Sequence, residues 1–217
     1  MKVDNKDMLL YLVTDRTWLR DKTLSEIVEL VIENGATFIQ LREKDMEHNR
    51  FRELAIEVKK ITDRYKIPFV INDDIDVAIE VNADGVHIGQ DDISLIRARE
   101  ILGKDKIIGV SVGNVDEAIK AEREGADYLG VGAIFSTTSK SDAIDVGIRE
   151  LKEITKAVDI PVVAIGGINE NNIQQLRGSG VDGIAVISAI LAKEDIAKAT
   201  RDLFKLSKEV LYEGGNI

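Results

Sequence analysis

Two hydrophobic patterns alternate along the chain from end to end. Short β-branched and apolar runs predict buried strands, and longer stretches with apolar residues three and four positions apart predict amphipathic helices. The helical spacing is clear at Leu24, Ile27, Val28, Val31 and Ile32, which would place one apolar stripe against a sheet. We expect eight strands, at residues 9–15, 38–43, 68–73, 85–90, 107–112, 128–135, 161–166 and 183–188.

This alternation predicts a parallel sheet covered by helices. Eight strand–helix units in 217 residues leave about 27 residues for each unit, which suits (β/α)8 barrels, since these begin at roughly 200 residues. No long linker interrupts the pattern. The expected fold class is therefore α/β, a (β/α)8 TIM barrel in a single compact domain over residues 1–217. A doubly wound open sheet is the alternative.

A weak repeat precedes every second predicted strand. Its four copies read NGAT at 34–37, NADG at 82–85, EGAD at 124–127 and GSGVDG at 178–183. A small residue that closes a helix before a tight turn is a local stability device and predicts no chemistry. Fourfold recurrence nevertheless favours four two-unit modules that close on themselves, and therefore the barrel over the open sheet.

Composition removes several functional classes. The 39 acidic side chains outnumber the 29 basic ones, and a net charge of −10 disfavours nucleic acid and anionic membranes as partners. The absence of cysteine removes disulfides, thiolate nucleophiles and cysteine-bound zinc. The apolar run at 8–13 is too short for a signal peptide or a membrane span, so we expect a cytoplasmic protein. Any anionic ligand needs a local binding device.

In such a barrel, that device belongs at the carboxyl ends of the strands, where loops and helix N-termini converge. After the second strand, the two-residue period of extended chain places Gln40, Arg42 and Lys44 on one side. Two cations and an amide would then line one wall of a binding site. The other interpretation is a solvated strand end with ordinary surface charges.

Carboxylates follow the next two strands. The third strand ends at Asn72 and Asp73, and the fourth is followed by Asp91 and Asp92. Neighbouring strands lie about 4.8 Å apart, so one carboxylate from each can approach a single Mg²⁺, which prefers oxygen ligands. Each cluster taken alone also reads as a helix cap. The candidate metal pair is Asp73 and Asp92.

The last three strand ends offer groups that suit phosphate. The segment 132–142 carries hydroxyls and one lysine, which fit phosphate oxygens or an ordinary solvated loop. Gly167 follows the seventh strand and Ser188 the eighth, the two positions at which barrels often bind phosphate. Ser111 ends the fifth strand. His87, inside the fourth strand, reads as a hydrogen-bonded interior histidine.

Taken in order, these motifs resemble the thiamine phosphate synthase family over residues 9–191. The motifs are Gln40-x-Arg42-x-Lys44, Asn72-Asp73, His87-Ile88-Gly89-Gln90-Asp91-Asp92, Gly109-Val110-Ser111, the threonine-rich loop ending at Lys140, Ala164-Ile165-Gly166-Gly167-Ile168 and Ile187-Ser188-Ala189-Ile190. The resemblance implies a (β/α)8 barrel that joins a hydroxymethylpyrimidine diphosphate to a thiazole phosphate. It also implies release of pyrophosphate, a requirement for Mg²⁺ and a homodimer.

The resemblance assigns roles to individual residues. Asp73 and Asp92 would hold Mg²⁺. The pyrimidine diphosphate would be bound by Gln40, Arg42, Lys44, Asn72, Ser111 and Lys140. Of these, the expected catalytic residues are Arg42, Lys44, Ser111 and Lys140. The thiazole phosphate would be bound by Thr137, Ser139, Gly167, Ile187 and Ser188.

Four positions depart from the family pattern. Ala133 and Ser136 stand where prolines are usual, Ser139 replaces a threonine, and Gly113 replaces a frequent histidine. We expect altered loop order and substrate packing at these positions.

Three other functions compete. A thiazole tautomerase resembles the synthase in fold but lacks its metal and diphosphate residues, and Gly113 cannot exchange a proton where the tautomerase has a histidine. A Schiff-base aldolase built on Lys44 or Lys140 leaves the paired aspartates unexplained. A non-catalytic module that binds vitamin phosphates has only the altered loop in its favour, and release of pyrophosphate separates it from an enzyme.

Overall fold

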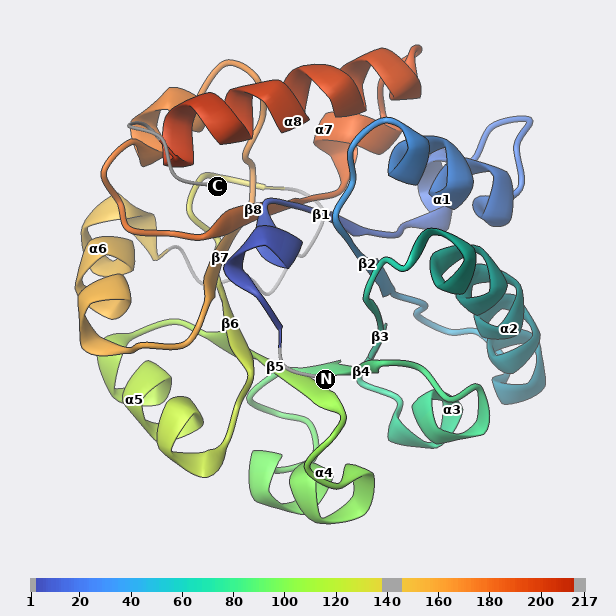
Figure 1. Cartoon of the computed structure of the whole chain (residues 1–217), viewed down its shortest axis with the longest axis horizontal. Helices are drawn as coiled ribbons and strands as arrows, with labels where there is room; N and C mark the ends of the chain where they lie inside the picture. The colour runs from blue at the N-terminus through green and yellow to red at the C-terminus, as the bar shows by residue number, and fades with distance from the viewer. Residues whose placement is uncertain (1–2, 138–145, 213–217) are drawn as a thin grey trace.

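The computed structural model describes residues 3–137 and 146–212. Eight parallel strands form a closed barrel in sequence order, in which β8 pairs with β1 (Figure 1). The strands are β1 (Leu10–Val13), β2 (Phe38–Leu41), β3 (Phe69–Asn72), β4 (Gly85–Ile88), β5 (Ile107–Val112), β6 (Tyr128–Val131), β7 (Val162–Ile165) and β8 (Gly183–Val186). The TIM barrel is confirmed, and the open sheet is excluded by the pairing of the first and last strands.

Helices form the outer ring around the strands (Figure 1). They are α1 (Leu24–Glu33), α2 (His48–Tyr65), α3 (Ile75–Glu80), α4 (Leu95–Leu102), α5 (Val115–Glu124), α6 (Gly147–Ala157), α7 (Ser188–Leu191) and α8 (Ile196–Leu211), with short 3-10 helices η1 (Asn5–Met8), η2 (Arg16–Trp18) and η3 (Ile173–Leu176). Most begin at a polar cap, as α1 does at Thr23, which forms a capping box with Glu26. Within the described residues, none of these helices has the length and apolar composition to cross a bilayer.

The unit after β7 departs from the regular strand–helix pattern. Only η3 follows this strand, in place of a full α-helix. The turn before η3 is held by hydrogen bonds between its own residues. Asn172 Oδ1 accepts the Asn169 N–H at 2.8 Å, and Asn172 Nδ2 donates to the Gly167 carbonyl at 2.9 Å. Polar side chains that bond the nearby backbone compete with helix formation in this way.

The barrel buries two separate cores. The strands are apolar on both sides because one face points into the barrel and the other against the helices. The larger core lies between strands and helices and includes most of the buried leucine, isoleucine and valine residues. The smaller core fills the barrel interior and consists of Met8, Tyr11, Val13, Phe38, Val70, Ile107, Tyr128, Val163 and Ala185.

The fourfold repeat lies at the amino ends of the strands and makes the same bond four times. In each copy, the residue before an even-numbered strand accepts a backbone N–H from the start of an odd-numbered strand. The pairs are Thr37 Oγ1 with Leu10 at 2.9 Å, Asp84 with Phe69 at 3.0 Å, Asp127 with Ile108 at 2.8 Å and Asp182 with Val162 at 2.8 Å. The repeat therefore links the amino ends of neighbouring strands, and its stabilising role stays a prediction.

Candidate active site

A cavity of about 1060 Å³ is lined by residues of all eight strands and by the loops after their carboxyl ends. Every predicted site residue that the structure describes lines this cavity. These are Gln40, Arg42, Lys44, Asn72, Asp73, Asp92, Ser111, Thr137, Gly167, Ile187 and Ser188. Ser139 and Lys140 lie outside the described residues. Closure of the barrel therefore brings strand ends that are far apart in sequence together around one cavity.

The end of β2 follows the predicted two-residue period. Gln40, Arg42 and Lys44 line the cavity, while Glu43 between them faces away and pairs with Arg16 at 2.6 Å. Burial raises the pKa of the Glu43 carboxyl, against the lowering effect of the Arg16 guanidinium. Gln40 is buried, Arg42 is half-buried and Lys44 is exposed. The two cations can therefore meet an anion that enters from solvent.

Asp73 and Asp92 lie at the same end of the barrel, in the loops that follow the neighbouring strands β3 and β4. The Asp73 N–H donates to the His87 carbonyl at 2.9 Å, and Asp73 has a φ of 64°. This left-handed conformation is one that aspartate tolerates better than most residues. Asp92 Oδ2 accepts the Gly89 N–H at 2.7 Å, which closes the loop after β4. Both side chains are exposed.

The acidic pair fits one kind of metal site better than another. No group of three or more His, Cys, Asp or Glu side chains within residues 3–137 and 146–212 is arranged to hold an ion by itself. Mg²⁺ is commonly bound by one or two carboxylates, with waters and substrate phosphates completing its coordination. Two exposed carboxylates beside Arg42 and Lys44 fit an ion that is bound together with a diphosphate.

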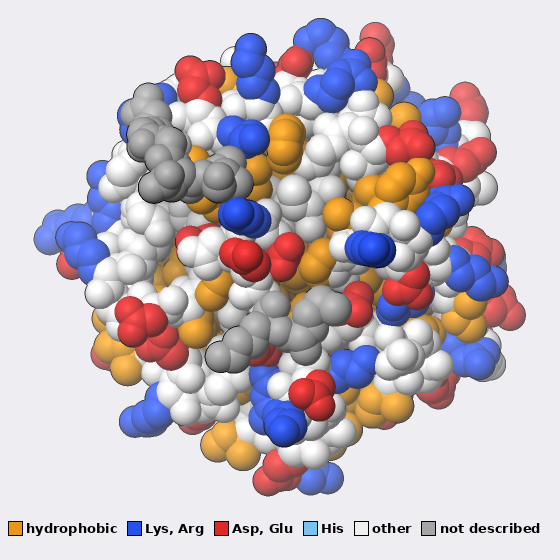
Figure 2. Space-filling model, viewed as in Figure 1, with side chains coloured by type: hydrophobic (Ala, Val, Ile, Leu, Met, Phe, Trp, Pro, Cys, Tyr) orange, Lys and Arg blue, Asp and Glu red, His pale blue; other side chains and the backbone are white. Residues whose placement is uncertain are grey.

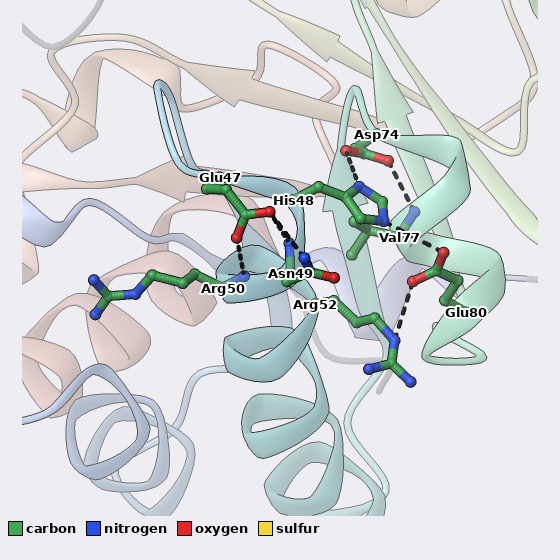
Figure 3. Close-up of polar contacts among 8 residues, drawn as sticks. All are labelled: Glu47, His48, Asn49, Arg50, Arg52, Asp74, Val77 and Glu80. Carbon is green, nitrogen blue, oxygen red and sulfur yellow. Dashed lines mark hydrogen bonds and ion pairs between the residues drawn. The ribbon is translucent and has the colours of Figure 1, made fainter.

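The turn after Asp73 is braced by helices α2 and α3, as Figure 3 shows. Asp74 caps the first turn of α3, and His48 at the start of α2 lies between Asp74 and Glu80. The His48 Nε2 atom is 3.3 Å from Glu80 Oε1, and Arg52 is 3.0 Å from the other oxygen of Glu80. His48 is an exposed residue, and its contacts join the start of α2 to the turn that follows Asp73.

The paired glycines after β7 have a packing explanation. Gly166 and Gly167 have φ values of 99° and 65°, which glycine adopts without strain. A Cβ at Gly166 would lie 2.6 Å from Ala133 Cα, and one at Gly167 would lie 2.5 Å from the Ser136 carbonyl oxygen. The loop after β6 thus passes directly over both glycines. The phosphate assignment of Gly167 rests on its place in the cavity.

Two of the positions that depart from the family pattern, Ala133 and Gly113, lie in segments with well-defined backbone contacts, and Ser139 lies outside the described residues. Ala133 is buried, and the two residues after it, Ile134 and Phe135, donate backbone hydrogen bonds to the end of β7, each at 3.0 Å. The Gly113 N–H donates to Glu117 Oε2 at 2.7 Å. The carboxylate of Glu117 therefore reaches the backbone at the position where the family often has a histidine.

An ion pair at the cavity wall was not predicted from the sequence. Lys193 and Glu170 both line the cavity and lie 2.5 Å apart, joining the loop after α7 to the loop after β7. Lys193 follows Ser188 by five residues, so proximity to a predicted phosphate site could have pointed to it. Glu170 gave no comparable signal, because it lies in a polar loop.

A chain of hydrogen bonds inside the barrel was also missed. Gln40 Nε2 donates to the Tyr11 hydroxyl at 2.5 Å, and the hydroxyls of Tyr11 and Tyr128 are 2.8 Å apart. The Tyr128 hydroxyl lies 2.9 Å from His87 Nδ1, and His87 Nε2 lies 2.9 Å from Ser111 Oγ. The prediction that His87 is a hydrogen-bonded interior histidine is confirmed.

Comparison with known proteins identifies close relatives. Residues 10–190 match the family model described as thiamine monophosphate synthase. A thiamine-phosphate synthase from Clostridium tetani is 55% identical over 92% of this chain and 95% of the relative, and one from Clostridium acetobutylicum is 55% identical over 94% and 97%. The solved structure of a thiamine phosphate pyrophosphorylase from Pyrococcus furiosus is 43% identical, with a TM-score of 0.88 over 95% of this chain and 98% of that chain.

Proposed function

Because the chain belongs to the thiamine monophosphate synthase family, we propose that its cavity is the site where a pyrimidine diphosphate and a thiazole phosphate are joined to give thiamine phosphate and pyrophosphate. The chain is a transferase of thiamine biosynthesis. The observation that carries the proposed site is that two cations and two carboxylates from three consecutive strand ends line one cavity, in a chain of net charge −10.

Arg42 and Lys44 are the proposed diphosphate contacts. Arginine presents a planar fork that can bind two phosphate oxygens, whereas lysine offers a compact charge on a flexible stem. Together they place two positive charges at one wall of the cavity. Lys140, outside the described residues, is proposed as a third cation on the same diphosphate.

Asp73 and Asp92 are the residues that would hold Mg²⁺. When bound there, the ion would supply positive charge to the diphosphate and to the departing pyrophosphate. Asn72, one residue before Asp73 at the end of β3, would contact the diphosphate with its amide. Side chains of the protein itself would supply the other contacts that the substrates require.

The proposed reaction separates charge. As the bond between the exocyclic carbon and the diphosphate oxygen breaks, negative charge accumulates on the pyrophosphate. Arg42 and Lys44 then interact with it more strongly than with the bound substrate, and this difference lowers the barrier. The electron-rich aminopyrimidine stabilises the carbon left behind, and the thiazole nitrogen captures it. No protein nucleophile is required, which suits a chain without cysteine.

The second substrate would be bound across the cavity. Strands β7 and β8 lie opposite β3 and β4 in the closed barrel. Thr137, Gly167, Ile187 and Ser188 line that side, and we propose that they, with Ser139 outside the described residues, hold the thiazole phosphate. A phosphate fixed there would aim the thiazole nitrogen at the carbon between the two sites, which gains rate through orientation.

The decisive experiment is an assay of the purified chain with both substrates and Mg²⁺. We expect equal amounts of pyrophosphate and thiamine phosphate. Thermal stabilisation by the substrates without pyrophosphate would overturn the proposal in favour of a binding module. A cytoplasmic location and a homodimer are further predictions, to be checked by fractionation and by light scattering.

A further inference from the structure

The hydrogen-bond chain inside the barrel connects two proposed substrate contacts. It runs from Gln40 through Tyr11, Tyr128 and His87 to Ser111, with every link between 2.5 and 2.9 Å. Gln40, Tyr11, His87 and Ser111 line the cavity, while Tyr128 is fully buried. Side chains that are distant in sequence are therefore connected along the inner wall of the barrel.

Glycines on neighbouring strands leave the space that the two rings at the centre of this chain occupy. A Cβ at Gly109 would lie 2.1 Å from Tyr128 Cζ, and one at Gly130 would lie 3.0 Å from His87 Cε1. Gly109 pairs with both His87 and Tyr128 in the strand register. Phe38 packs edge-on against the Tyr128 ring, with 5.6 Å between ring centres. The ring positions are thus fixed by packing as well as by hydrogen bonds.

Each hydroxyl in the chain has one proton to donate and can also accept. Tyr11 is buried and accepts from the Gln40 amide, and its own proton finds an acceptor within the chain when it is donated to Tyr128. In that order Tyr128 donates to His87 Nδ1, which puts the single proton of a neutral imidazole on Nε2. That proton is donated to Ser111 Oγ. The Ser111 hydroxyl proton is left to point into the cavity.

Both phenols keep their protons under ordinary conditions. Burial raises the pKa of Tyr11 and of Tyr128, and the nearby Tyr11 hydroxyl raises that of Tyr128 further. Neither hydroxyl can therefore become an acceptor-only group that would break the direction of the chain.

We propose that this chain holds His87 as the neutral Nε2–H tautomer, and thereby presents Ser111 to the pyrimidine as a hydrogen-bond donor and Gln40 Oε1 as an acceptor. An aminopyrimidine ring offers the complementary pair, a ring nitrogen that accepts and an amino group that donates. Tyr11, Tyr128 and His87 are positioning residues that set the polarity of the two contacts. This reading of the pyrimidine contacts rests on the proposed function, whereas the tautomer does not.

The tautomer can be measured without substrate. The chain has only two histidines, so His48→Gln leaves His87 as the single ¹⁵N-labelled imidazole. Near neutral pH we expect the nitrogen shifts of a protonated Nε2 and an unprotonated Nδ1. Tyr128→Phe removes the donor to Nδ1, and we expect averaged shifts that show a mixture of tautomers. A protonated Nδ1 in the otherwise unchanged chain overturns the proposal.

The kinetic test separates positioning from general damage. Tyr128→Phe is expected to raise the KM for the pyrimidine diphosphate about tenfold, the effect of one misdirected hydrogen bond, with little change in the KM for the thiazole phosphate. Phe38→Leu is the matched control, because it loosens the same ring packing but breaks no hydrogen bond. It should lower the melting temperature and leave the tautomer and both KM values nearly unchanged.

Replacement of His87 completes the test. His87→Gln keeps an acceptor and a donor and should retain more pyrimidine affinity than His87→Leu. Equal loss in both variants, or equal rises in both KM values for Tyr128→Phe, would overturn the positioning role. If the unchanged chain shows the expected tautomer but makes no pyrophosphate, the proposed function fails while the tautomer assignment stands.

Discussion

The two ends of the barrel place the same residue type in different surroundings. At the amino rim, defined by Thr37, Asp84, Asp127 and Asp182, three carboxylates accept backbone N–H groups from neighbouring strands. At the carboxyl rim, Asp73 and Asp92 are exposed and line the cavity beside Arg42 and Lys44. The three amino-rim aspartates therefore bond the backbone of neighbouring strands, whereas Asp73 and Asp92 at the carboxyl rim are the proposed metal ligands.

The surface of the amino rim agrees with a structural role. In Figure 1, η1 lies in front of the barrel centre, so Figure 2, drawn from the same side, shows this end of the molecule. Acidic and basic side chains are mixed over the visible face. At the carboxyl rim, Arg42 and Lys44 line the cavity after β2, and Asp73, Asp91 and Asp92 line it after β3 and β4.

The largest difference between the rims should appear when aspartate is replaced by asparagine. Asp73→Asn or Asp92→Asn removes a proposed Mg²⁺ ligand charge and should reduce kcat/KM roughly a hundredfold or more, without a change in melting temperature. The same substitution at the amino rim, Asp84→Asn, should leave turnover intact. Near-normal rates for either carboxyl-rim variant at saturating Mg²⁺ would contradict the metal assignment.

A second substitution tests the amino rim for stability. Asp127 accepts the Ile108 N–H at 2.8 Å and pairs with Arg99 at 2.6 Å. Asp127→Ala leaves a half-buried N–H without its acceptor and should lower the free energy of unfolding by about 1–3 kcal/mol, with turnover per folded molecule unchanged. Urea unfolding measures the first quantity and the pyrophosphate assay the second. An unaltered urea midpoint would show that the repeat does not stabilise the fold.

The pH dependence of stability gives a smaller effect. Burial raises the pKa of Asp182, against lowering by the Val162 N–H, so the folded chain binds a proton on this carboxyl at higher pH than the unfolded chain does. The group therefore lowers stability near neutral pH, and this cost is relieved as pH falls through the raised pKa. Asp182→Asn should gain most over the original chain near pH 7, and the difference should shrink toward acid pH in urea unfolding. A stability difference that grows as the pH falls would contradict the predicted direction of the pKa shift.

The smallest effect is expected at the ion pair on the carboxyl rim. Lys193 and Glu170 are both substantially exposed, so Lys193→Ala should change the free energy of unfolding by less than about 1 kcal/mol. A rise of a few-fold in the KM for the thiazole phosphate would show that Lys193 contributes to that site. Lys198→Ala, which removes an exposed ion pair outside the cavity, is the matched control.

Some parts of the site could be predicted because they depend on neighbours in sequence. The period of two placed Gln40, Arg42 and Lys44 on one wall and Glu43 on the other, as the structure has them. Other parts needed information from distant segments. The paired glycines after β7 suggested a phosphate, but the structure adds a packing reason, the loop that passes over them from β6.

What the sequence by itself determined was local: eight strands, their helices, the fourfold turn motif and the residues that follow each strand end. These depend on periodicity and turn chemistry over a few residues. Only the tertiary structure decided which side chains meet across the barrel. Tyr11 and Tyr128 are 117 residues apart, and their hydroxyls meet because closure and register place them there. A local sequence pattern cannot specify this contact, because the contact depends on closure of the barrel by the pairing of β8 with β1.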